Sequence, residues 1–335
     1  MKRLHVAILG ATGAVGQEFL SILAERKFPI AGLKLLASGK SAGKKIKFQG
    51  KDIAIEEARP DSFEGIDLVL SSAGASVSRE LVPEAIKRGA VVVDNTSAFR
   101  MQSDVPLVIP EVNPEEIFKH KGVIANPNCS TIIMAVPLYP LHKAARLKRA
   151  VVSTYQAASG AGMKAMRELE EQTREVLEGK KPTRKVFRHQ IAFNLFSHDS
   201  LIRQDGFTEE EFKMIEETKK IFRAPEIAVM PTTIRVPVLR AHSESIVAEF
   251  EKPLSEEEAR RIFEKAPGVE VVDRREENYF PMPLEASGKD NVLVGRIRKD
   301  PSAKNALAFF VSGDQLRKGA ALNAVQIAEI LFQKS

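Results

Sequence analysis

The sequence is poor in cysteine and in aromatic residues. Its 335 residues include one cysteine, Cys129, no tryptophan and only 6% aromatic residues. A single cysteine excludes an internal disulfide framework and any metal site built from several cysteines. The basic residues are interleaved with glutamates, as between Glu209 and Lys220, and do not form one stripe with aromatic residues between them. We therefore expect no bound metal and no nucleic-acid partner.

Long hydrophobic runs are also missing. The longest apolar stretch, from Ile132 to Leu141, contains Pro137 and Pro140 and is much shorter than the ~20 residues of a membrane-spanning helix. The apolar residues near the start, up to Leu9, are too few for a signal peptide and lead directly into a glycine-rich turn. We expect a cytoplasmic protein with no membrane partner.

The length and the net charge bear on the number of domains and on the kind of ligand. A chain of 335 residues exceeds what a single hydrophobic core usually covers, which predicts two domains. Lysine and arginine number 50 against 44 acidic residues, so the formal net charge is +6. This small excess is compatible with anionic small-molecule ligands.

The first part of the chain alternates short β-branched runs with amphipathic helical stretches. Strands are expected at 4–10, 33–38, 66–72, 90–95 and 123–125, helices at 14–26 and 77–88, and a small hairpin at 45–55 that turns at Gly50. Repetition of strand, helix and strand predicts a Rossmann-type, doubly wound parallel sheet with right-handed crossovers.

The second part has longer strands and long charged helices. Helices are expected at 162–178, 209–222 and 255–265, and strands at 150–156, 227–238, 245–250, 269–272, 293–298 and 306–312. This pattern predicts an α+β domain with a mainly antiparallel sheet. A last helix, 319–333, is expected to pack back on the first domain, which gives domains of 1–128 plus 316–335 and of 129–315. The basic stretch 179–188 resembles a linker.

A glycine-rich segment follows the first expected strand and opens a helix. Small residues there allow a dinucleotide pyrophosphate to approach backbone N–H groups at a helix N-terminus. The spacing is G-x-x-G-x-x-G, a variant of the usual fingerprint. The alternative is a tight turn without a ligand. The candidate cofactor-binding residues are Gly10, Thr12, Gly13, Ala14, Val15 and Gly16.

The end of the second expected strand bears on the choice of cofactor. An NAD site usually has an acidic residue there to bind the ribose 2′-hydroxyl. Residues 37–44 contain no acid, and they offer two hydroxyls and two cations instead, from Ser38, Ser41, Lys40 and Lys44. This composition favours NADP, with NAD as a secondary cofactor. The alternative is a solvated basic loop.

Cys129 lies in the sequence Asn-Pro-Asn-Cys-Ser-Thr at 126–131, between a short apolar strand and an apolar helical run. Asn128 can cap the helix that follows, which places Cys129 in its first turn, where free N–H groups and the helix dipole stabilise a thiolate. A lone cysteine is more often a buried small hydrophobic residue. The junction with a helix, in a chain expected to bind a nicotinamide, favours a nucleophile.

A thiolate beside a nicotinamide has a specific use in carbonyl chemistry. It attacks a carbonyl, and the resulting adduct can exchange hydride with the cofactor through a thioester. This chemistry needs a proton-transfer partner, which is usually a histidine. His242 stands out because it follows a strand at the start of a polar segment, but the sequence alone places no histidine beside Cys129. The histidines are His5, His120, His142, His189, His198 and His242.

The ordered set of motifs resembles the aspartate-β-semialdehyde dehydrogenase family over essentially the whole chain. The motifs are GATGAVG at 10–16, DNTSAFR at 94–100, NPNCST at 126–131, YQAASGAG at 155–162, RVPV at 235–238, HSE at 242–244 and RKGAA at 317–321. Residues Asn128 and Ser130 flank the cysteine, where N-acetyl-glutamyl-phosphate reductases usually have Gly and Tyr. The resemblance implies a dinucleotide-binding domain followed by a catalytic and dimerisation domain.

The resemblance also implies roles for individual residues. Cys129 would be the nucleophile that forms an acyl thioester, His242 the general acid/base, and Gln156 the residue that orients the substrate. Arg235 would bind the substrate α-carboxylate, and Glu210 would face the substrate amine. The remaining expected contacts are Arg100, Lys213 and Asn128 for phosphate, and Ser159, Gly160 and Gln315 for the nicotinamide.

The resemblance implies NADPH-dependent reductive dephosphorylation of L-4-aspartyl phosphate to L-aspartate 4-semialdehyde, in the biosynthesis of lysine, threonine, methionine and isoleucine. The expected partners are aspartyl phosphate, phosphate and further copies of the chain in a homodimer or homotetramer. Lys40 replaces a common arginine and Gln315 a common asparagine. The alternatives are an acyl-phosphate reductase of the N-acetyl-glutamyl-phosphate reductase type and a non-catalytic homologue.

Overall fold

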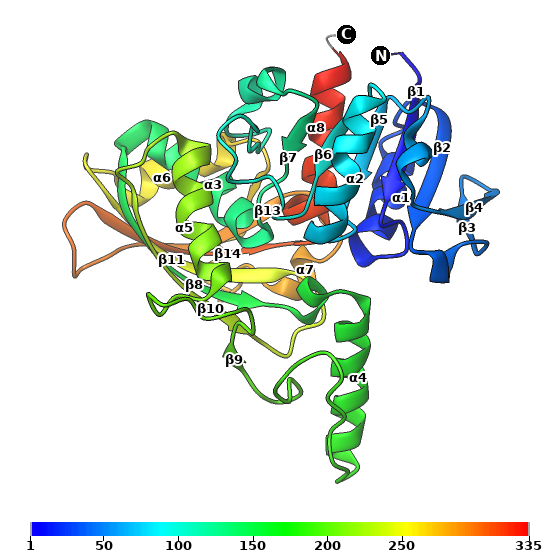
Figure 1. Ribbon diagram of the computed structural model, residues 1–335. Coiled ribbons are helices and arrows are strands. Elements are labelled where there is room, and N and C mark those ends of the chain that lie inside the picture. The colour runs from blue at the N-terminus through cyan, green and yellow to red at the C-terminus, as the bar shows by residue number, and fades with distance from the viewer. Residues whose placement is uncertain (1, 334–335) are drawn as a thin grey trace. The chain divides into compact units, whose positions relative to one another are not determined.

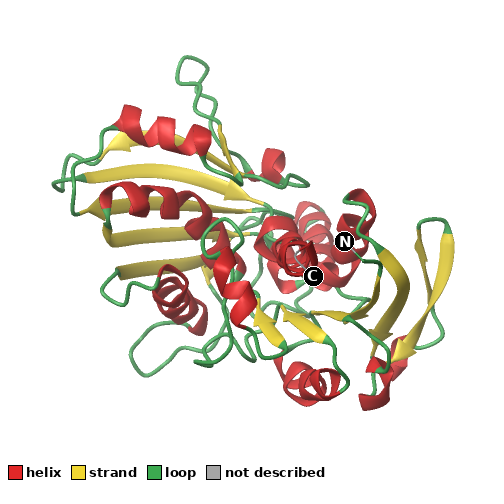
Figure 2. Ribbon diagram, turned by 90° about the horizontal axis from the view of Figure 1, so that it is seen from above, coloured by secondary structure: helices red, strands yellow, loops and turns green. Residues whose placement is uncertain are grey.

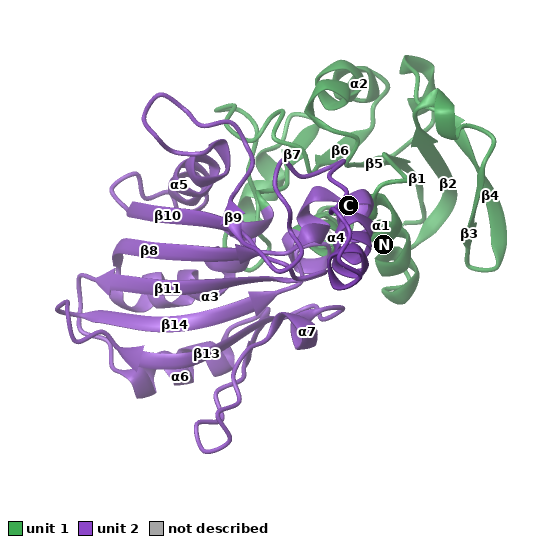
Figure 3. Ribbon diagram, turned by 90° about the horizontal axis from the view of Figure 1, so that it is seen from below, with its two compact units in different colours: residues 1–128, 320–335 green, residues 129–319 purple. Residues whose placement is uncertain are grey.

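The chain forms two compact units, which Figure 3 shows in different colours. The computed structural model describes residues 2–333. Unit 1 consists of residues 1–128 and 320–335, and unit 2 of residues 129–319. In the described chain, each unit contains one seven-stranded sheet (Figure 1).

The sheet of unit 1 is parallel except at one edge. Its strand order is β3-β4-β2-β1-β5-β6-β7, and only β3 and β4 pair antiparallel. The predicted Rossmann-type sheet and the predicted hairpin at Gly50 are therefore confirmed. The strands are β1 (Leu4–Leu9), β2 (Ile30–Ala37), β3 (Lys45–Phe48), β4 (Lys51–Glu57), β5 (Leu68–Ser71), β6 (Val91–Asp94) and β7 (Val123–Ala125).

Helices cover both faces of this sheet (Figure 2). Helix α1 (Ala14–Glu25) connects β1 to β2, and α2 (Ala75–Lys87) connects β5 to β6 in the opposite direction along the sheet. Right-handed crossovers therefore place α1 and α2 on opposite faces. Helix α8 (Leu322–Gln333) contacts α1, and its apolar side chains are part of the same buried core. The predicted return of the last helix to the first sheet is confirmed, but a π-helical turn, Arg317–Ala321, precedes α8.

The sheet of unit 2 has the order β12-β13-β14-β11-β8-β10-β9. Four of its six pairings are antiparallel, and only β12–β13 and β8–β10 are parallel. This arrangement confirms the predicted mainly antiparallel sheet. The strands are β8 (Leu147–Gln156), β9 (Phe196–Ser197), β10 (Ala228–Arg235), β11 (His242–Phe250), β12 (Val269–Val271), β13 (Val292–Lys299) and β14 (Ala306–Gly313).

One face of the second sheet is covered by helices and the other is half-exposed. Helix α3 (Cys129–Ala145) contacts β11 and both α5 (Glu209–Phe222) and α6 (Glu256–Lys265), which contact β10 and β13. Along β10, buried and exposed residues alternate, as expected for a sheet with one covered face. Tyr155 and Met230 are exposed on the other face. Helices α4 (Met163–Leu177) and α7 (Pro283–Ala286) complete the unit.

Two expectations need correction in unit 2. Strand β11 begins at His242, three residues before the predicted start, because the polar residues pair within the sheet: the Ser243 and Ser312 hydroxyls are 2.7 Å apart. The linker interpretation of 179–188 is wrong. The buried carboxylate of Glu168 accepts backbone N–H groups of Lys185, Val186 and Phe187, which fixes this segment against α4.

Glu244 is a fully buried carboxyl group in β11. Its strand partner is Thr154, and in the described chain neither the Glu244 carboxyl oxygens nor the Thr154 hydroxyl has a hydrogen-bond partner. Burial raises the pKa of Glu244 well above its ordinary value, because an isolated charge is costly to desolvate. Glu244 therefore keeps its proton to a higher pH in the folded protein than in the unfolded chain.

Replacing Glu244 by glutamine tests this protonation state. Above the unfolded-state pKa of 4.5, the unfolded chain releases a proton that the folded chain keeps, so the wild type loses stability as the pH rises. We expect the unfolding free energy of Glu244→Gln, relative to wild type, to increase by up to ~1.4 kcal/mol per pH unit. Urea unfolding at pH 5 to 8 measures this difference.

The control is Glu249→Gln on the same strand, where the carboxylate pairs with Lys148 at 2.8 Å and is partly exposed. We expect no comparable growth with pH for this variant. If the difference in unfolding free energy between Glu244→Gln and wild type is constant from pH 5 to 8, Glu244 has the same pKa in the folded and unfolded states.

Candidate active site

The glycine-rich turn between β1 and α1 requires glycine at two positions. Gly10 has a φ of +93°, and a Cβ there would lie 2.9 Å from the backbone nitrogen of Ala73. A Cβ on Gly16 would lie 2.3 Å from the carbonyl oxygen of Gly10. Gly10 thus permits the tight turn, and Gly16 permits close packing of α1 on that turn.

A pocket of about 640 Å³ lies at this turn. It is at the carboxyl ends of β1, β2 and β5, where the strand order reverses, which is the usual ligand position in such sheets. Of the residues expected to bind the cofactor in unit 1, the structure brings together four that line the pocket and leaves the others out of the lining. The four are Gly10, Thr12, Gly13 and Ser38, and the others are Ala14, Val15, Gly16, Lys40 and Ser41.

The sequence analysis missed three charged residues of this pocket, which are Glu57, Arg59 and Glu80. Strand β4 pairs parallel with β2, which places Glu57 beside Ala37. The Oε1 atom of Glu57 lies 2.6 Å from where a Cβ on Gly39 would be, and Glu57 forms an ion pair with Arg59 at 2.6 Å. The signal for Glu57 in the sequence is the predicted hairpin at 45–55. Its second strand, β4, lies beside β2, so the acidic residue of the pocket is on β4 and not at the end of β2.

Cys129 is the first residue of α3, as the sequence predicts, and is partly exposed. A Cβ on Gly319 would lie 3.1 Å from the Cβ of Cys129, so the absence of a side chain at Gly319 leaves space beside the thiol-bearing residue. The next residue, Ser130, is fully buried, and its hydroxyl accepts a hydrogen bond from Nε2 of Gln156 at 2.5 Å.

The side-chain amide of Gln156 links Ser130, the residue after Cys129, to the start of α5. Its Nε2 also lies 3.2 Å from Oε1 of Glu210, and Oε2 of Glu210 is 3.4 Å from Nζ of Lys213. Thr208 caps α5 and holds Glu210 in its first turn. In the described chain, Oε1 of Gln156 has no hydrogen-bond partner, so it is an available acceptor.

Strand register places three candidate side chains on the same face of the sheet. Arg235 on β10 is the parallel partner of Gln156 on β8. Ser243 of β11 pairs with Tyr155, so the residue before it, His242, lies beside Gln156. All three side chains are buried. His242 pairs with Gly313, where a Cβ would lie 3.0 Å from Ile133, one helical turn after Cys129. The face that bears His242 is therefore the one that α3 covers.

The imidazole of His242 has a defined proton position. Its Nδ1 accepts the backbone N–H of Ala157 at 3.0 Å, so the neutral ring carries its proton on Nε2, which has no hydrogen-bond partner among the described residues. Complete burial, and secondarily the charge of Arg235, lowers the pKa of His242 to about 3. The ring is therefore neutral at neutral pH and presents an N–H donor.

The backbone just before His242 is held by residues that follow β14. Ala241 has a φ of +71°, an unfavourable value for a residue with a Cβ. Its N–H donates to Oε1 of Gln315 at 2.9 Å, while Nε2 of Gln315 donates to the Ser159 hydroxyl. The amide of Gln315 is thus used within unit 2, where it joins Ser159 to the residue before His242.

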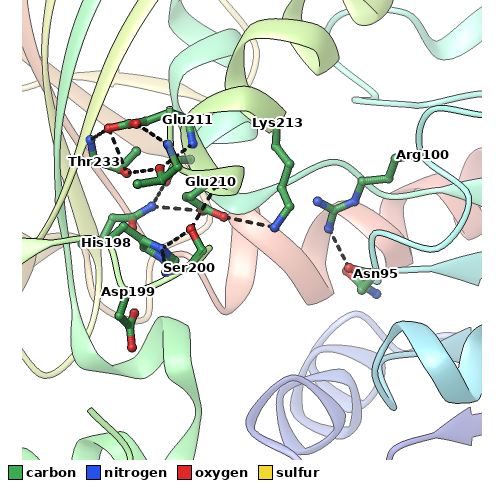
Figure 4. A network of polar contacts seen from close by, with 12 residues as sticks. Asn95, Arg100, His198, Asp199, Ser200, Glu210, Glu211, Lys213 and Thr233 are labelled. Atoms are coloured by element: carbon green, nitrogen blue, oxygen red, sulfur yellow. Dashed lines mark hydrogen bonds and ion pairs between the residues drawn. The ribbon is translucent and has the colours of Figure 1, made fainter. Parts of the chain in front are cut away.

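Arg235 is held at the end of β10. Its Nη1 donates to the carbonyl oxygen of Ala157 at 3.3 Å, Nη2 lies 2.9 Å from Nε2 of His198, and Nε is 3.6 Å from Asp199. His198 is the functional candidate that the sequence analysis did not single out. Figure 4 shows His198 beside Ser200, Asp199 and Glu210.

The remaining predicted phosphate ligands, Arg100 and Asn128, belong to unit 1, whereas Lys213 belongs to unit 2. Arg100 is buried in the loop after β6, where Nη2 donates to the carbonyl oxygen of Asn95 at 2.7 Å (Figure 4) and Nε to that of Asn126 at 2.9 Å. Asn128 directly precedes Cys129 in the chain.

Residues 2–333 contain no helix that is long and apolar enough to cross a bilayer. In the same part of the chain, no group of three or more His, Cys, Asp or Glu side chains is arranged to hold a metal ion.

Comparison with known families defines the class of protein. Residues 5–120 match the model for the NAD binding domain of semialdehyde dehydrogenases, and residues 138–318 match the model for their dimerisation domain. The fold and the two matches define an oxidoreductase of the semialdehyde dehydrogenase class.

Similarity to individual proteins is more specific. The chain is 55% identical to aspartate-semialdehyde dehydrogenase of Synechocystis sp. over 331 residues, which cover 99% of this chain and 98% of that protein. It is 53% identical to that of Aquifex aeolicus, with 98% of each chain covered. The structure of aspartate semialdehyde dehydrogenase II from Vibrio cholerae complexed with ASA matches with a TM-score of 0.97, 43% identity and 99% coverage of both chains. The chain belongs to the aspartate-semialdehyde dehydrogenase family.

Gly160 offers a test of how tightly this site is packed. A Cβ there would lie 2.9 Å from Nη1 of Arg235 and 3.0 Å from Cε1 of His242. We expect Gly160→Ala to displace both side chains and to lower kcat/KM of the dehydrogenase reaction about tenfold or more. The melting temperature should stay close to that of wild type, because Gly160 is exposed and has no positive φ.

Ala161→Ser is the matched control, since it adds one atom at the next exposed position of the same turn. Steady-state kinetics and thermal melting of the two variants separate the outcomes. If kcat/KM of Gly160→Ala equals that of wild type, Arg235 and His242 can move away from the added methyl group without a loss of activity.

Proposed function

We propose that this protein catalyses the NADPH-dependent reductive dephosphorylation of L-4-aspartyl phosphate to L-aspartate 4-semialdehyde and phosphate, through a thioester on Cys129. The observation that carries the proposal is the position of Cys129 at the start of α3, on the side of the sheet that bears Gln156, Arg235 and His242. The relatives named aspartate-semialdehyde dehydrogenase support the substrate.

Substrate binding follows from the buried charges. Arg235 binds the α-carboxylate, because a guanidinium group can donate two parallel hydrogen bonds to a carboxylate. The buried carboxylate of Glu210 faces the substrate amine, and a free ammonium group suits it better than an acetylated nitrogen. Glu210 therefore favours aspartyl phosphate over N-acetyl-glutamyl phosphate. Arg100, Lys213 and Asn128 bind the phosphate group.

Cys129 performs the covalent step. Its thiolate attacks the acyl carbon, a sulfur–carbon bond forms, and the carbon–oxygen bond to phosphate breaks, so that phosphate leaves. The neutral ring of His242 donates its Nε2–H to the developing oxyanion. Acceptance of the thiol proton by Nε2 needs the other tautomer, in which the bond from Ala157 to Nδ1 is lost. Gln156 orients the substrate, because its free amide oxygen can accept a hydrogen bond from the substrate ammonium group.

The cofactor fits the pocket of unit 1. A Cβ at Gly10 would collide with the backbone, and the absence of side chains at Gly10 and Gly13 lets a pyrophosphate approach this turn at the N-terminus of α1. When bound, the reduced nicotinamide supplies the hydride that converts the thioester into the aldehyde. Gly10, Thr12 and Gly13 would hold the pyrophosphate, and Ser159, Gly160 and Gln315 belong to the nicotinamide side. The structure of the Candida albicans enzyme with NADP, 26% identical with a TM-score of 0.77, supports the choice of cofactor class.

We further propose NADP as the preferred cofactor and NAD as a secondary one. Ser38 lines the pocket, and Lys40 and Ser41 stand in the same turn, the 3₁₀-helix of residues 39–41. Arg59 supplies another cation at this end of the pocket, while Glu57 neutralises part of its charge.

A homodimer fits the half-exposed sheet face of unit 2. Residues 138–318 match a dimerisation domain, and this face exposes apolar side chains, including Tyr155 and Met230. Burial of such a face against a second copy would remove these side chains from water.

Cys129→Ser tests the covalent mechanism. Serine is a far weaker nucleophile at neutral pH, so we expect phosphate-dependent reduction of NADP by aspartate semialdehyde to fall by ~10³-fold or more. Binding of NADP, measured by calorimetric titration, should be retained, since the pocket lies in unit 1. Turnover within about tenfold of wild type, a barrier change of only ~1.4 kcal/mol, would contradict the thioester.

Lys40→Ala and Arg59→Ala test the cofactor preference. We expect each to raise the KM for NADP about fivefold or more, because a cation that contacts the 2′-phosphate is lost, and to leave the KM for NAD nearly unchanged. Lys47→Ala, which removes an exposed cation of β3, is the matched control. Equal changes for the two cofactors would mean that neither cation contacts the 2′-phosphate.

A further inference from the structure

His198 is a largely buried histidine that the mechanism above does not use. We propose that His198 is a positioning residue that holds the guanidinium group of Arg235 in the orientation needed to bind the substrate α-carboxylate. The contact is direct, since Nη2 of Arg235 lies 2.9 Å from Nε2 of His198. The proposal rests on the role of Arg235 given under the proposed function.

The backbone on both sides of the contact is fixed. Strand β9 pairs with the end of β10, with Phe196 opposite Arg235. The N–H of His198 donates to the carbonyl oxygen of Thr233 at 2.8 Å. This bond continues the ladder of β9 by one residue, so the imidazole leaves the backbone at a set position beside the guanidinium group.

The chemistry of the pair determines the tautomer of His198. A guanidinium group has only donors, so Nε2 of His198 must offer its lone pair, and the ring proton is on Nδ1. Nδ1 lies 3.1 Å from the Ser200 hydroxyl and 3.2 Å from the Ser200 backbone nitrogen (Figure 4). A neutral ring has one lone pair, and the permanently charged guanidinium group takes it at Nε2, so Nδ1 donates to the Ser200 hydroxyl and does not accept the Ser200 N–H. The N–H of Glu210 also points to that hydroxyl, at 3.3 Å. Burial lowers the pKa of His198 to about 4, so the ring is neutral and able to accept at neutral pH.

The remaining donors of Arg235 match a carboxylate. One N–H on Nη1 is directed to the carbonyl oxygen of Ala157 and one on Nη2 to His198. One N–H on each of these nitrogens is left, which is the arrangement that binds two carboxylate oxygens side by side. Binding by His198 and Ala157 therefore leaves the end of the guanidinium group available to the substrate.

A competing partner explains why Arg235 needs to be held. Asp199 lies 3.6 Å from Nε of Arg235, a distance that gives attraction without a short hydrogen bond. Without His198, this carboxylate can draw the guanidinium group toward itself and turn its donors away from the substrate. His198 thus provides a neutral acceptor that fixes Arg235 without neutralising it.

The test is a kinetic comparison of His198→Ala and His198→Gln with aspartate semialdehyde, phosphate and NADP. We expect His198→Ala to raise the KM for the semialdehyde about tenfold, as for loss of a hydrogen bond to a charged group. Its kcat and its KM for NADP should stay within about twofold. His198→Gln should restore most of the affinity, because the glutamine amide oxygen can accept from Arg235. His189→Ala, an exposed histidine of the same unit, is the matched control and should behave as wild type.

A second substrate identifies the group that is affected. 3-Aminopropanal lacks the α-carboxylate, so His198→Ala should not weaken its use any further. An equal loss with both aldehydes, or an unchanged KM for the semialdehyde, would overturn the proposal. If His198→Ala does not fold, as judged by thermal melting, the same comparison with Ser200→Ala decides, because that variant removes the acceptor of the Nδ1 proton and should raise the same KM.

Arg235→Ala separates this proposal from the proposed function. If that variant leaves the KM for the semialdehyde unchanged, the role of Arg235 in the proposed function is wrong. If Arg235→Ala raises this KM and His198→Ala does not, only the positioning role of His198 fails. In the double variant, the effect of His198→Ala should disappear, since the residue that it positions is absent.

Discussion

The register of three neighbouring strands in unit 2 is the constraint on which the site depends. The pairing of β8 with β10 and β11 sets Gln156 beside both Arg235 and His242, with all three side chains on one face. Since side chains alternate along a strand, a slip of one residue would turn one of them to the opposite face. The ladder hydrogen bonds along eight paired residues of β8 and β10 therefore position the site as well as the sheet.

Burial then determines which of these groups carry charge. His242 and His198 are neutral because their rings are desolvated, which lowers the pKa of each, and the pKa of Glu244 is raised for the same reason. Arg235 keeps its charge next to two neutral acceptors, the ring of His198 and the carbonyl oxygen of Ala157. The same low-dielectric layer thus contains a cationic anchor and a neutral N–H donor, which is a useful combination for binding an anionic substrate and stabilising an oxyanion.

Local sequence patterns were sufficient for the architecture. The alternation of apolar strands with helices predicted the parallel sheet of unit 1, and the Pro-Asn before Cys129 predicted that a helix begins at this residue. Segment 179–188 was misread as a linker because its fixed structure comes from Glu168, which is distant in sequence and binds the backbone from α4. The basic composition of this segment indicates that its side chains favour water, but it does not show a contact with a residue that is distant in the sequence.

The parts of the candidate site that could not be predicted all depend on pairing between distant strands. Glu57 reaches the cofactor pocket because β4 is the neighbour of β2, and His198 reaches Arg235 because the two-residue strand β9 pairs with β10. The pairing of β9 has no local signal, because a strand of two residues is too short for a periodic pattern. The predicted hairpin is a signal for β4, but the hairpin alone does not show that β4 pairs in parallel with β2.

The contribution of α8 to unit 1 has a consequence for synthesis of the chain on the ribosome. The core of unit 1 includes Leu322, Val325 and Leu331, which are made about two hundred residues after β7, whereas unit 2 is one continuous segment. The first sheet therefore keeps an uncovered apolar surface while the whole of unit 2 is being made, until α8 emerges. Such a surface makes an unfinished chain prone to aggregation.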